Sequence, residues 1–473
     1  MIRLGISLIT NAVIGGEVGN PLDLNPYLYF IGSENVITDG GAVASWGQRS
    51  AGDNQLSRSL AQGTANLQPD NSGSLAVKFD GSDDKLAFDV AVAQAGILIV
   101  ATSNGIWACE VDADSVDEIT ALGWERGYFE DLDLYAYILL PASVTDTEIG
   151  EVVSWLDENT DATKNPTGAL DSYFRSRTDV VSLKFDAIDF SGVTSIGYAF
   201  PAMSSLTSFP QIDTSGVTQW TYAFLNNSNL ASFPELDTSN GTNFSLTWFG
   251  CSSLTSFPEL DFSKGSNFAY AWYNCTGLTS FPALDLTAGR SFQLAWSNCN
   301  NASFTSFPAI TFSTSGSITL NFQQTWKGCS KLTSFPAFNL SRGTIFKETW
   351  RSCSSLSTFP AVNITAGTNF NGAWHSCTSL TTFPANLFDS WSPTSVVDNC
   401  FNEAWDGCTA LTATSVENIL NSLAAAGVAA PSSGVDITID FNASSGTPSV
   451  ASAVSTLKGL SPAWTITLNG VAQ

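Results

Sequence analysis

A dipeptide, Phe-Pro, recurs at nearly constant spacing through the middle of this 473-residue chain. It begins at Phe209, Phe233, Phe257, Phe281, Phe307, Phe335, Phe359 and Phe383, in steps of 24, 24, 24, 26, 28, 24 and 24 residues. One copy of such a unit cannot bury its own apolar face, so the copies must stack on one another. The period therefore predicts an array of stacked repeats.

Other residue types keep the same phase. An aromatic ladder comprises Phe200, Phe224, Trp248, Trp272, Trp296, Trp326, Trp350, Trp374 and Trp405. Cysteine follows three residues later at Cys251, Cys275, Cys299, Cys329, Cys353, Cys377 and Cys408, with Met203 and Asn227 in the two earliest copies. Phe268, Trp272 and Cys275 fall at i, i+4 and i+7, which predicts one face of a short helix or 3₁₀ turn. The Leu-Thr-Ser-Phe segment favours a short strand, which proline ends by removing a backbone donor.

The repeat reads Gly-x-x-Phe-x-x-Ala-Trp-x-x-Cys-x-x-Leu-Thr-Ser-Phe-Pro, and it resembles BspA-like leucine-rich repeats. The resemblance covers roughly residues 180–411. It implies a leucine-rich-repeat-type solenoid of about nine turns, placed at residues 178–411, in which glycines such as Gly241 and Gly343 supply a tight bend. Proteins with these repeats are mostly adhesins or surface-exposed binding proteins.

The repeated cysteines and tryptophans are more simply explained as core than as functional groups. Zinc sites need paired spacings such as C-x₂-C, and none occurs here. We expect buried thiols that pack as small apolar groups, with Cys109 and Cys400 buried as well. The tryptophan position also accepts Phe200 and Phe224, which favours core packing over a surface that grips sugar rings.

Candidate recognition residues lie at two repeat positions that we expect to face outward. The Thr-Ser pair would form a hydroxyl array suited to glycan or, less readily, ice binding, unless it serves only strand propensity and solubility. The residue after each tryptophan varies freely, and His375, the only histidine, is expected to be a solvated side chain that builds no Ser-His-Asp site. The candidates are Thr255, Ser256, Thr279, Ser280, Thr333, Ser334, Tyr273, Lys327, Arg351 and His375.

Residues 1–165 show no repeat, and short apolar runs alternate there with Gly, Asn, Asp and Ser. The runs 75–79, 86–92, 97–101 and 134–140 predict an antiparallel β-sandwich. Residues 74–88 (SLAVKFDGSDDKLAF), 43–54 (VASWGQRSAGDN) and 135–159 resemble segments of concanavalin-like or laminin G-like domains, which we place at 36–165. This implies glycan binding and leaves calcium open as a ligand of the acidic clusters at 80–84 and 110–118, although neither has EF-hand spacing. We expect no other cofactor.

The remaining segments are shorter. Thr145-x-x-Glu148 is a capping box for a helix, and residues 1–35 are assigned as an attachment arm. Residues 412–473 predict a small α/β cap on the end of the repeats, with helices from Thr414 to near Gly427 and over 448–458, and strands over 435–441 and 464–468. The predicted fold is therefore mixed: a β-sandwich, a repeat solenoid and an α/β cap.

The charge of the chain limits the classes of partner that we expect. The formal net charge is −25, and residues 1–170 hold 25 acidic against 7 basic residues. Nucleic acid and anionic membrane surfaces require clustered Lys and Arg, so neither is an expected partner. We expect no membrane insertion, since no run approaches a membrane span, and the first sixteen residues make a weak secretory signal because Asn11 interrupts the apolar run.

The predicted function is a non-enzymatic phage virion protein of the tail- or head-fibre type that presents its repeat surface for host-cell or glycan adhesion. Other virion proteins would bind the N-terminal region, a host surface glycan or protein would bind the repeats, and a homo-oligomer is left open. Alternatives are a secreted or cell-surface bacterial adhesin and a purely structural decoration protein of the virion. A glycosidase would need paired carboxylates in a cleft, and no motif recommends one.

Overall fold

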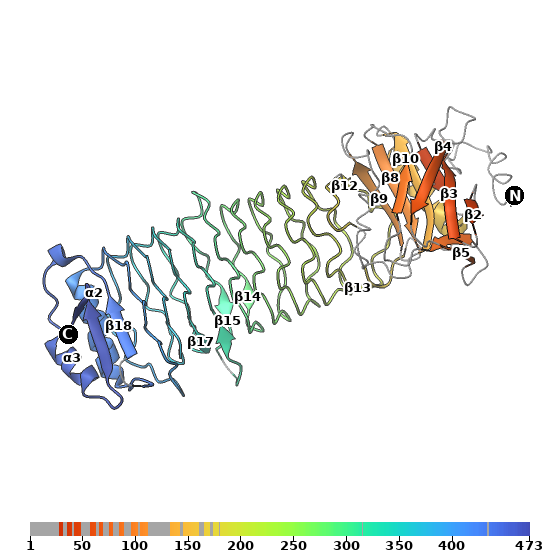
Figure 1. Cartoon of the computed structure of the whole chain (residues 1–473). Coiled ribbons are helices and arrows are strands. Elements are labelled where there is room, and N and C mark those ends of the chain that lie inside the picture. The colour runs from red at the N-terminus through yellow and green to blue at the C-terminus, as the bar shows by residue number, and fades with distance from the viewer. Residues whose placement is uncertain are drawn as a thin grey trace. The chain divides into compact units, whose positions relative to one another are not determined.

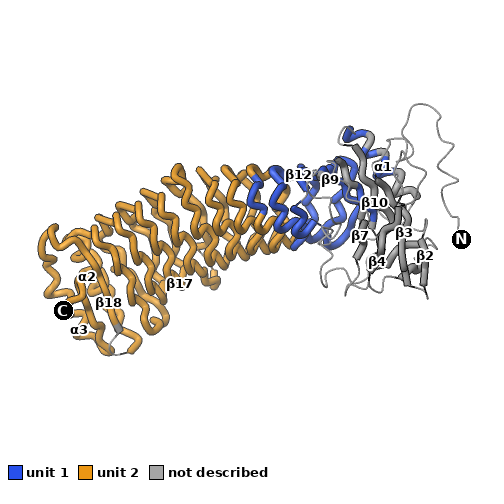
Figure 2. The backbone as a smooth tube through the Cα atoms, turned by 45° about the horizontal axis from the view of Figure 1, so that its top comes forward, with its two compact units in different colours: residues 1–217, 227–230 blue, residues 218–226, 231–473 orange. Residues whose placement is uncertain are grey.

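A computed structural model describes ten strands between Leu28 and Pro141, together with residues 145–159, 165–170, 174–178, 180–314, 316–432 and 435–473. The chain divides into two compact units (Figure 2). Unit 1 holds residues 1–217 and 227–230, and unit 2 holds residues 218–226 and 231–473. The predicted arm at 1–35 and both acidic clusters lie almost wholly outside the described residues.

Unit 1 is built on one hydrogen-bonded sheet. Its strands are β1 (Leu28–Ile31), β2 (Val36–Asp39), β3 (Ala42–Gln48), β4 (Ser57–Gln62), β5 (Asn66–Pro69), β6 (Leu75–Lys78), β7 (Lys85–Phe88), β8 (Gly96–Thr102), β9 (Gly105–Val111), β10 (Asp133–Pro141) and β12 (Val180–Leu183). The order is β12-β9-β8-β10-β6-β5-β3-β4-β7, with β1 on β10 and β2 on β3. All of these pairings are antiparallel.

The predicted β-sandwich is therefore wrong. Strands do form at the four predicted runs, but they join a single 11-stranded sheet instead of two facing sheets. The long strand β10 explains this, because it pairs with β8 from Leu134 to Pro141, with β1 through four residues, and with β6 at its start. One strand thus connects sets of strands that a sandwich would keep in separate layers.

The helix at the capping box is confirmed. α1 (Asp146–Asn159) begins where Ile149 N donates to Thr145 O at 3.0 Å, and Ile149, Val152 and Val153 are buried. After it come two short parallel strands, β11 (Gly168–Ala169) and β13 (Val193–Ser195). Trp107 of β9 packs edge-to-face on Phe174 and Phe185, so the sheet shares an aromatic core with the first repeat-like turns of unit 1.

In unit 2, residues 231–411 form what we call the repeat array. The predicted helix or 3₁₀ turn around each tryptophan is wrong, because two residues per copy adopt left-handed backbone. These residues stand two before and two after the tryptophan, as at Tyr270 (φ 59°) and Asn274 (φ 63°) around Trp272. Left-handed residues end a right-handed helix, so each copy runs through consecutive turns instead.

The predicted leucine-rich-repeat solenoid of about nine turns is wrong as well, since the repeat array holds no continuous sheet (Figure 1). Its strands are β14 (Asp285–Leu286), β15 (Thr311–Phe312), β16 (Leu320–Asn321) and β17 (Gly343–Ile345), and they pair only two by two. Elsewhere single parallel bridges join consecutive copies, such as Asn243 to Asn267 and Thr358 to Thr382. Proline and the left-handed residues leave too few extended residues per copy for a longer ladder.

Three columns of stacked aromatic rings hold the copies together. The tryptophans from Trp248 to Trp405 stack with centroids 5.1–6.0 Å apart. The phenylalanines four residues earlier stack at 5.2–5.7 Å, and the Phe-Pro rings meet the tryptophans edge-to-face. The indole nitrogens in this column have no hydrogen-bond partner among the described residues, so the rings serve through their apolar area.

The C-terminal elements of unit 2 lie close to their predicted positions. They are α2 (Ala413–Ala426), β18 (Val435–Ile439), α3 (Ala451–Lys458), β19 (Trp464–Leu468) and β20 (Val471–Ala472). Thr412 caps α2, and Gly427 ends it in left-handed conformation (φ 64°). A parallel bridge from Trp405 to Ile439 connects this segment to the last repeat.

Candidate recognition surface

The repeated cysteines belong to the interior, as predicted. All nine cysteines are buried thiols that form no disulfide. Each ladder thiol donates to the carbonyl of the aromatic residue one copy earlier, as Cys299 does to Trp272 O at 3.3 Å and Cys377 to Trp350 O at 3.1 Å. Burial raises the pKa of the Cys299 thiol to about 12, so this thiol is protonated at neutral pH.

Asn227 shows why this position is not simply apolar. It stands where later copies have cysteine, and its Nδ2 donates to Phe200 O at 3.0 Å. The amide thus repeats the bond made by the thiols, and its Oδ1 accepts from Met203 N at 2.8 Å. The position thus holds a buried side-chain donor that bonds the aromatic carbonyl of the preceding copy; at Trp272 O this bond adds to the one from Cys275 N at 3.3 Å.

The predicted hydroxyl array is exposed, but much of its hydrogen-bonding capacity is already used. Thr255, Ser256, Thr279, Ser280, Thr333 and Ser334 are all exposed. The threonine hydroxyls donate backwards to backbone carbonyls, as Thr279 does to Thr255 O at 3.0 Å and Thr333 to Thr305 O at 3.1 Å. These threonines therefore brace adjacent copies and can only accept hydrogen bonds from a ligand.

A second outward surface follows the tryptophans. The residues two before and one after each tryptophan are mostly half-buried and point away from the aromatic core; we call these two rows the ridge. Its described members in the array are Leu246, Phe249, Tyr270, Tyr273, Leu294, Ser297, Gln324, Lys327, Glu348, Arg351, Gly372, His375, Glu403 and Asp406. Leu294 and Ser297 are buried, so the ridge divides into two outward parts at that copy.

The first part is aromatic. Phe249 and Tyr273 stack with centroids 4.8 Å apart and an interplanar angle of 16°, and Tyr270 lies 5.8 Å from Tyr273. Asn298 Nδ2 lies 3.4 Å from Tyr273 Oη, so the phenol oxygen is held by the next copy. We call Phe249, Tyr270 and Tyr273 the aromatic platform.

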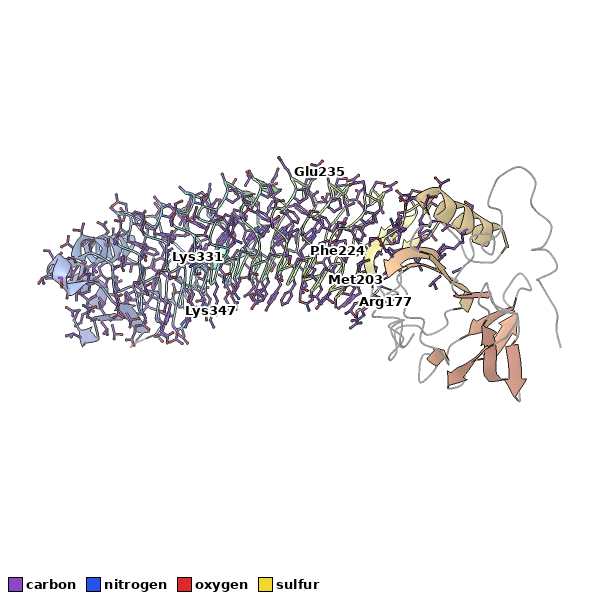
Figure 3. The ribbon with its side chains drawn as sticks, turned by 90° about the horizontal axis from the view of Figure 1, so that it is seen from above. Arg177, Met203, Phe224, Glu235, Lys331 and Lys347 are labelled. Carbon is purple, nitrogen blue, oxygen red and sulfur yellow. The ribbon has the colours of Figure 1, made fainter. Side chains whose placement is uncertain are left out.

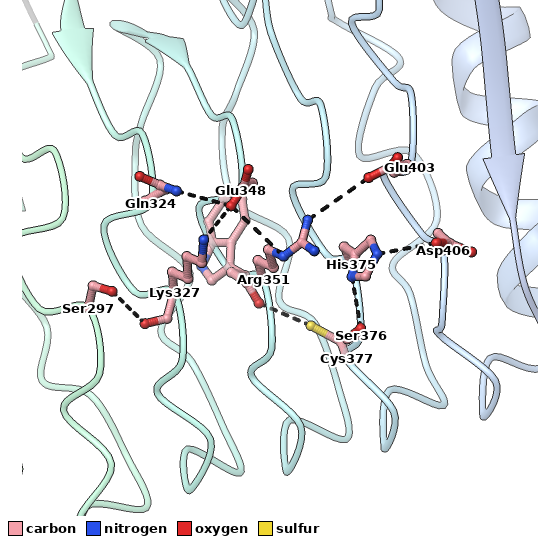
Figure 4. A network of polar contacts seen from close by, with 11 residues as sticks. Ser297, Gln324, Lys327, Glu348, Arg351, His375, Ser376, Cys377, Glu403 and Asp406 are labelled. Carbon is pink, nitrogen blue, oxygen red and sulfur yellow. Dashed lines mark hydrogen bonds and ion pairs between the residues drawn. The ribbon is translucent and has the colours of Figure 1, made fainter.

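The second part is a connected set of charged and polar groups (Figure 4). Glu348 accepts from Lys327 Nζ at 2.6 Å and from Gln324 Nε2 at 3.0 Å, and Arg351 lies 3.9 Å from it. Arg351 also reaches Glu403 at 4.0 Å. We call this set, with His375, Ser376 and Asp406, the polar network.

Glu348 is the centre of the polar network. Burial disfavours its ionised form, but the hydrogen bonds from Lys327 and Gln324 and the charges of Lys327 and Arg351 outweigh that effect, so its pKa lies below the ordinary value. The carboxylate stays ionised at neutral pH. Its φ of 52° is left-handed, which shows that backbone conformation as well as charge fixes its direction.

His375 is not the solvated side chain that the sequence suggested. Its side chain is 17 % exposed, its Nε2 lies 3.2 Å from Asp406 Oδ2, and its Nδ1 lies 2.8 Å from Ser376 Oγ. This links a serine, a histidine and an aspartate. The adjacent backbone donors are already used, since Ser376 N donates to Asp406 O at 2.8 Å and Cys377 N to Trp374 O at 3.1 Å, so neither is available to an oxyanion.

The chain matches no family model, no curated protein and no solved structure in three comparisons. Within the described residues, no group of three or more His, Cys, Asp or Glu side chains is placed to hold a metal ion. None of the helices described is long and apolar enough to cross a membrane.

The structure brings together some predicted residues and separates others. Lys327, Arg351 and His375 lie along one polar network, and Tyr273 joins the aromatic platform. The hydroxyl array forms another row, at other repeat positions. Sequence analysis missed Tyr270, Gln324 and Glu348, which stand two residues before a tryptophan. The signal was present, because that position also varies from copy to copy.

Proposed function

We propose that this chain is a non-enzymatic phage virion protein whose repeat array presents an adhesion surface to a host cell. One observation carries the proposal: the aromatic, cysteine and leucine residues that recur from copy to copy are buried in the core, whereas the outward ridge holds residues that vary. A surface of this kind suits recognition, since its chemistry can change without altering the core that supports it.

The virion setting rests on the resemblance of the repeats and of the N-terminal segments to phage and bacterial surface proteins. In this proposal the N-terminal region binds other virion proteins, the particle is released outside the cell, and the ridge meets a host glycan or protein. A secreted bacterial adhesin would use the same ridge. A decoration protein would use none of it.

Binding of the purified full chain to intact bacterial cells tests the adhesive role. We expect saturable binding to cells of the host and little binding to unrelated cells, and we expect labelled antibody to decorate purified phage particles. Decoration without cell binding would favour the structural alternative, and cell binding without decoration would favour the secreted adhesin. Absence of both would sink the proposal.

The contact of Ser376, His375 and Asp406 raises hydrolysis as a competing function. Because the nearby backbone donors are occupied, we expect no turnover of activated esters above the rate of protein with Ser376→Ala. The matched control, Ser379→Ala, changes an exposed serine in the same copy. Ester hydrolysis that Ser376→Ala abolishes and Ser379→Ala spares would overturn the non-enzymatic assignment.

A further inference from the structure

We propose that the ridge is a binding site for an uncharged linear polysaccharide, which stacks a sugar ring on the aromatic platform and continues along the array toward the polar network. This inference rests on the proposed adhesive function and names its ligand class.

The aromatic platform is the first support. Phe249, Tyr270 and Tyr273 are half-buried, whereas the rings of the three stacked columns are buried. The near-parallel stack of Phe249 on Tyr273 (16°) unites two copies in one aromatic cluster. Each of these two rings covers one face of the other, so the apolar C–H face of a pyranose would pack on an outer face of the pair or on Tyr270, where it removes apolar area from water.

Polar groups beside the aromatic platform are the second support. A sugar ring presents hydroxyls around its edge, so its site needs donors and acceptors with fixed directions. Tyr273 Oη, Asn298 and, farther along the array, Gln324 provide both kinds, and neighbouring copies hold each of them. A membrane surface or an apolar peptide would leave the remaining hydrogen-bonding capacity of these groups unused.

Charge balance indicates that the ligand is neutral. The cations of the polar network, Lys327 and Arg351, already face the carboxylates of Glu348 and Glu403, and His375 faces Asp406. An anionic polymer would have to compete with these carboxylates, and it would approach a chain of net charge −25. A neutral polymer with hydroxyls can use the same groups as they stand.

The array geometry favours a chain over a single sugar. The ridge repeats the same two backbone positions in every copy, with the underlying tryptophans 5.2–6.0 Å apart over the central copies. A polymer aligned with the array would meet the aromatic platform and, beyond the copy with buried Leu294 and Ser297, the polar network. Affinity would then grow with chain length, because linked contacts reinforce one another.

Affinity electrophoresis of the full chain tests this inference. The native gels contain neutral glucan, galactan or mannan, anionic polygalacturonate, or polysaccharide extracted from cells that the protein binds. We expect retardation in at least one neutral gel. Tyr273→Ala and Phe249→Ala should each weaken it by roughly tenfold or more, as for buried aromatic anchors. Tyr273→Phe keeps the ring but loses the phenol oxygen, so it should weaken the retardation less than Tyr273→Ala does.

Thr279→Ala is the matched control, since Thr279 is an exposed member of the hydroxyl array. Its retardation should equal that of the unchanged protein, and circular dichroism should confirm that every variant is folded. Retardation by polygalacturonate alone, equal retardation of Tyr273→Ala, or none in any neutral gel would each overturn the inference. Cell binding that persists in that case would leave the proposed adhesive function standing, whereas absence of cell binding would remove both.

Discussion

At the scale of single residues, the ladder cysteine is a buried hydrogen-bond donor. The thiol of Cys299 gives the carbonyl of Trp272 a second hydrogen bond beside the one from Cys275 N, and Asn227 bonds Phe200 O in the equivalent way. A hydrogen bond of this kind contributes about 0.5–1.5 kcal/mol to stability. We therefore attribute the recurrence of cysteine to its size and its S–H group.

Alkaline pH tests this assignment through Cys299. The pKa of this thiol is about 12 in the folded protein, whereas the ordinary value for a cysteine is 9.0. Above pH 9 the unfolded chain therefore loses a proton that the folded chain keeps. The free energy of unfolding is then unaffected below about pH 9 and falls as pH rises toward 12, by at most about 1.4 kcal/mol per pH unit for this thiol.

We expect Cys299→Ala to lower the free energy of unfolding at pH 7 by about 0.5–1.5 kcal/mol and to flatten its decline above pH 9. Denaturant titrations at a series of pH values measure both effects. Cys299→Ser keeps a donor and should retain more stability at pH 7. An unchanged alkaline slope in Cys299→Ala would contradict the buried-thiol assignment.

Left-handed residues give a second prediction at this scale. Ser352 has a φ of 62°, which costs an L-residue about 1–2 kcal/mol, and the same position is Gly328 one copy earlier. Ser352→Gly should raise the free energy of unfolding by about 0.5–1 kcal/mol after the entropy of glycine is counted. Ser355→Gly, outside the left-handed region, should lower it. Thermal melts compare them, and destabilisation by both substitutions would refute the argument.

At the scale of the repeat element, the conserved spacing of glycine and phenylalanine is a packing requirement. A Cβ at Gly343 would lie 2.3 Å from Cζ of Phe346 and 3.0 Å from Leu340 O. Gly241, Gly289 and Gly367 have the same relation to the phenylalanine three residues on, and none of them has positive φ. Gly343 does close the tight turn expected from the sequence, since its N donates to Leu340 O at 2.7 Å, but that turn needs no positive φ, and glycine is required for the space under the ring.

A pair of substitutions tests this packing. Gly343→Ala should lower the free energy of unfolding by about 1–3 kcal/mol, as overpacked cores do. Phe346→Leu shortens the opposing side chain. It should therefore lower the free energy of unfolding less in the Gly343→Ala protein than in the unchanged protein. Chemical denaturation of the four proteins gives the coupling. Strictly additive losses would mean that the ring and the glycine do not oppose each other.

The sequence predicted the elements unevenly, for physical reasons. Period and phase were sufficient to assign the buried columns, since Trp272 and Cys275 could not recur so regularly on a free surface. The i, i+4, i+7 spacing wrongly predicted a helix or 3₁₀ turn, because consecutive turns with left-handed Tyr270 and Asn274 bury the same residues as a helix would. In unit 1, periodicity located β8 and β10, but no local pattern shows that β10 also pairs with β1 and β6.

At the scale of the whole molecule, the chain combines strong acidity with a neutralised ridge. Its net charge of −25 is concentrated in residues 1–170, whereas 180–411 hold 13 acidic and 8 basic residues. Figure 3 shows Glu235 and Lys347 at opposite edges of unit 2 in that view. The negative net charge of the chain repels anionic surfaces.

The candidate site was only partly predictable at this scale. Tyr273, Lys327, Arg351 and His375 were found because the position after tryptophan varies. Lys327 pairs with Glu348, which lies 21 residues later in the chain. Glu348 belongs to the next copy and occupies a different position of the repeat. Such diagonal neighbours depend on how the copies are offset, and the offset follows from packing that no single copy encodes.

Hydroxyl-radical footprinting of the full chain, free and with the neutral polysaccharide that retards it, tests the central claim that invariant residues form the core and varied residues form the recognition surface. Oxidation of each side chain is read by mass spectrometry. We expect Phe249, Tyr270 and Tyr273 to be labelled in the free protein and protected in the complex, with Trp272 and Trp350 unlabelled in both. Labelling of those tryptophans in the free protein, or protection confined to residues outside the ridge, would contradict the account.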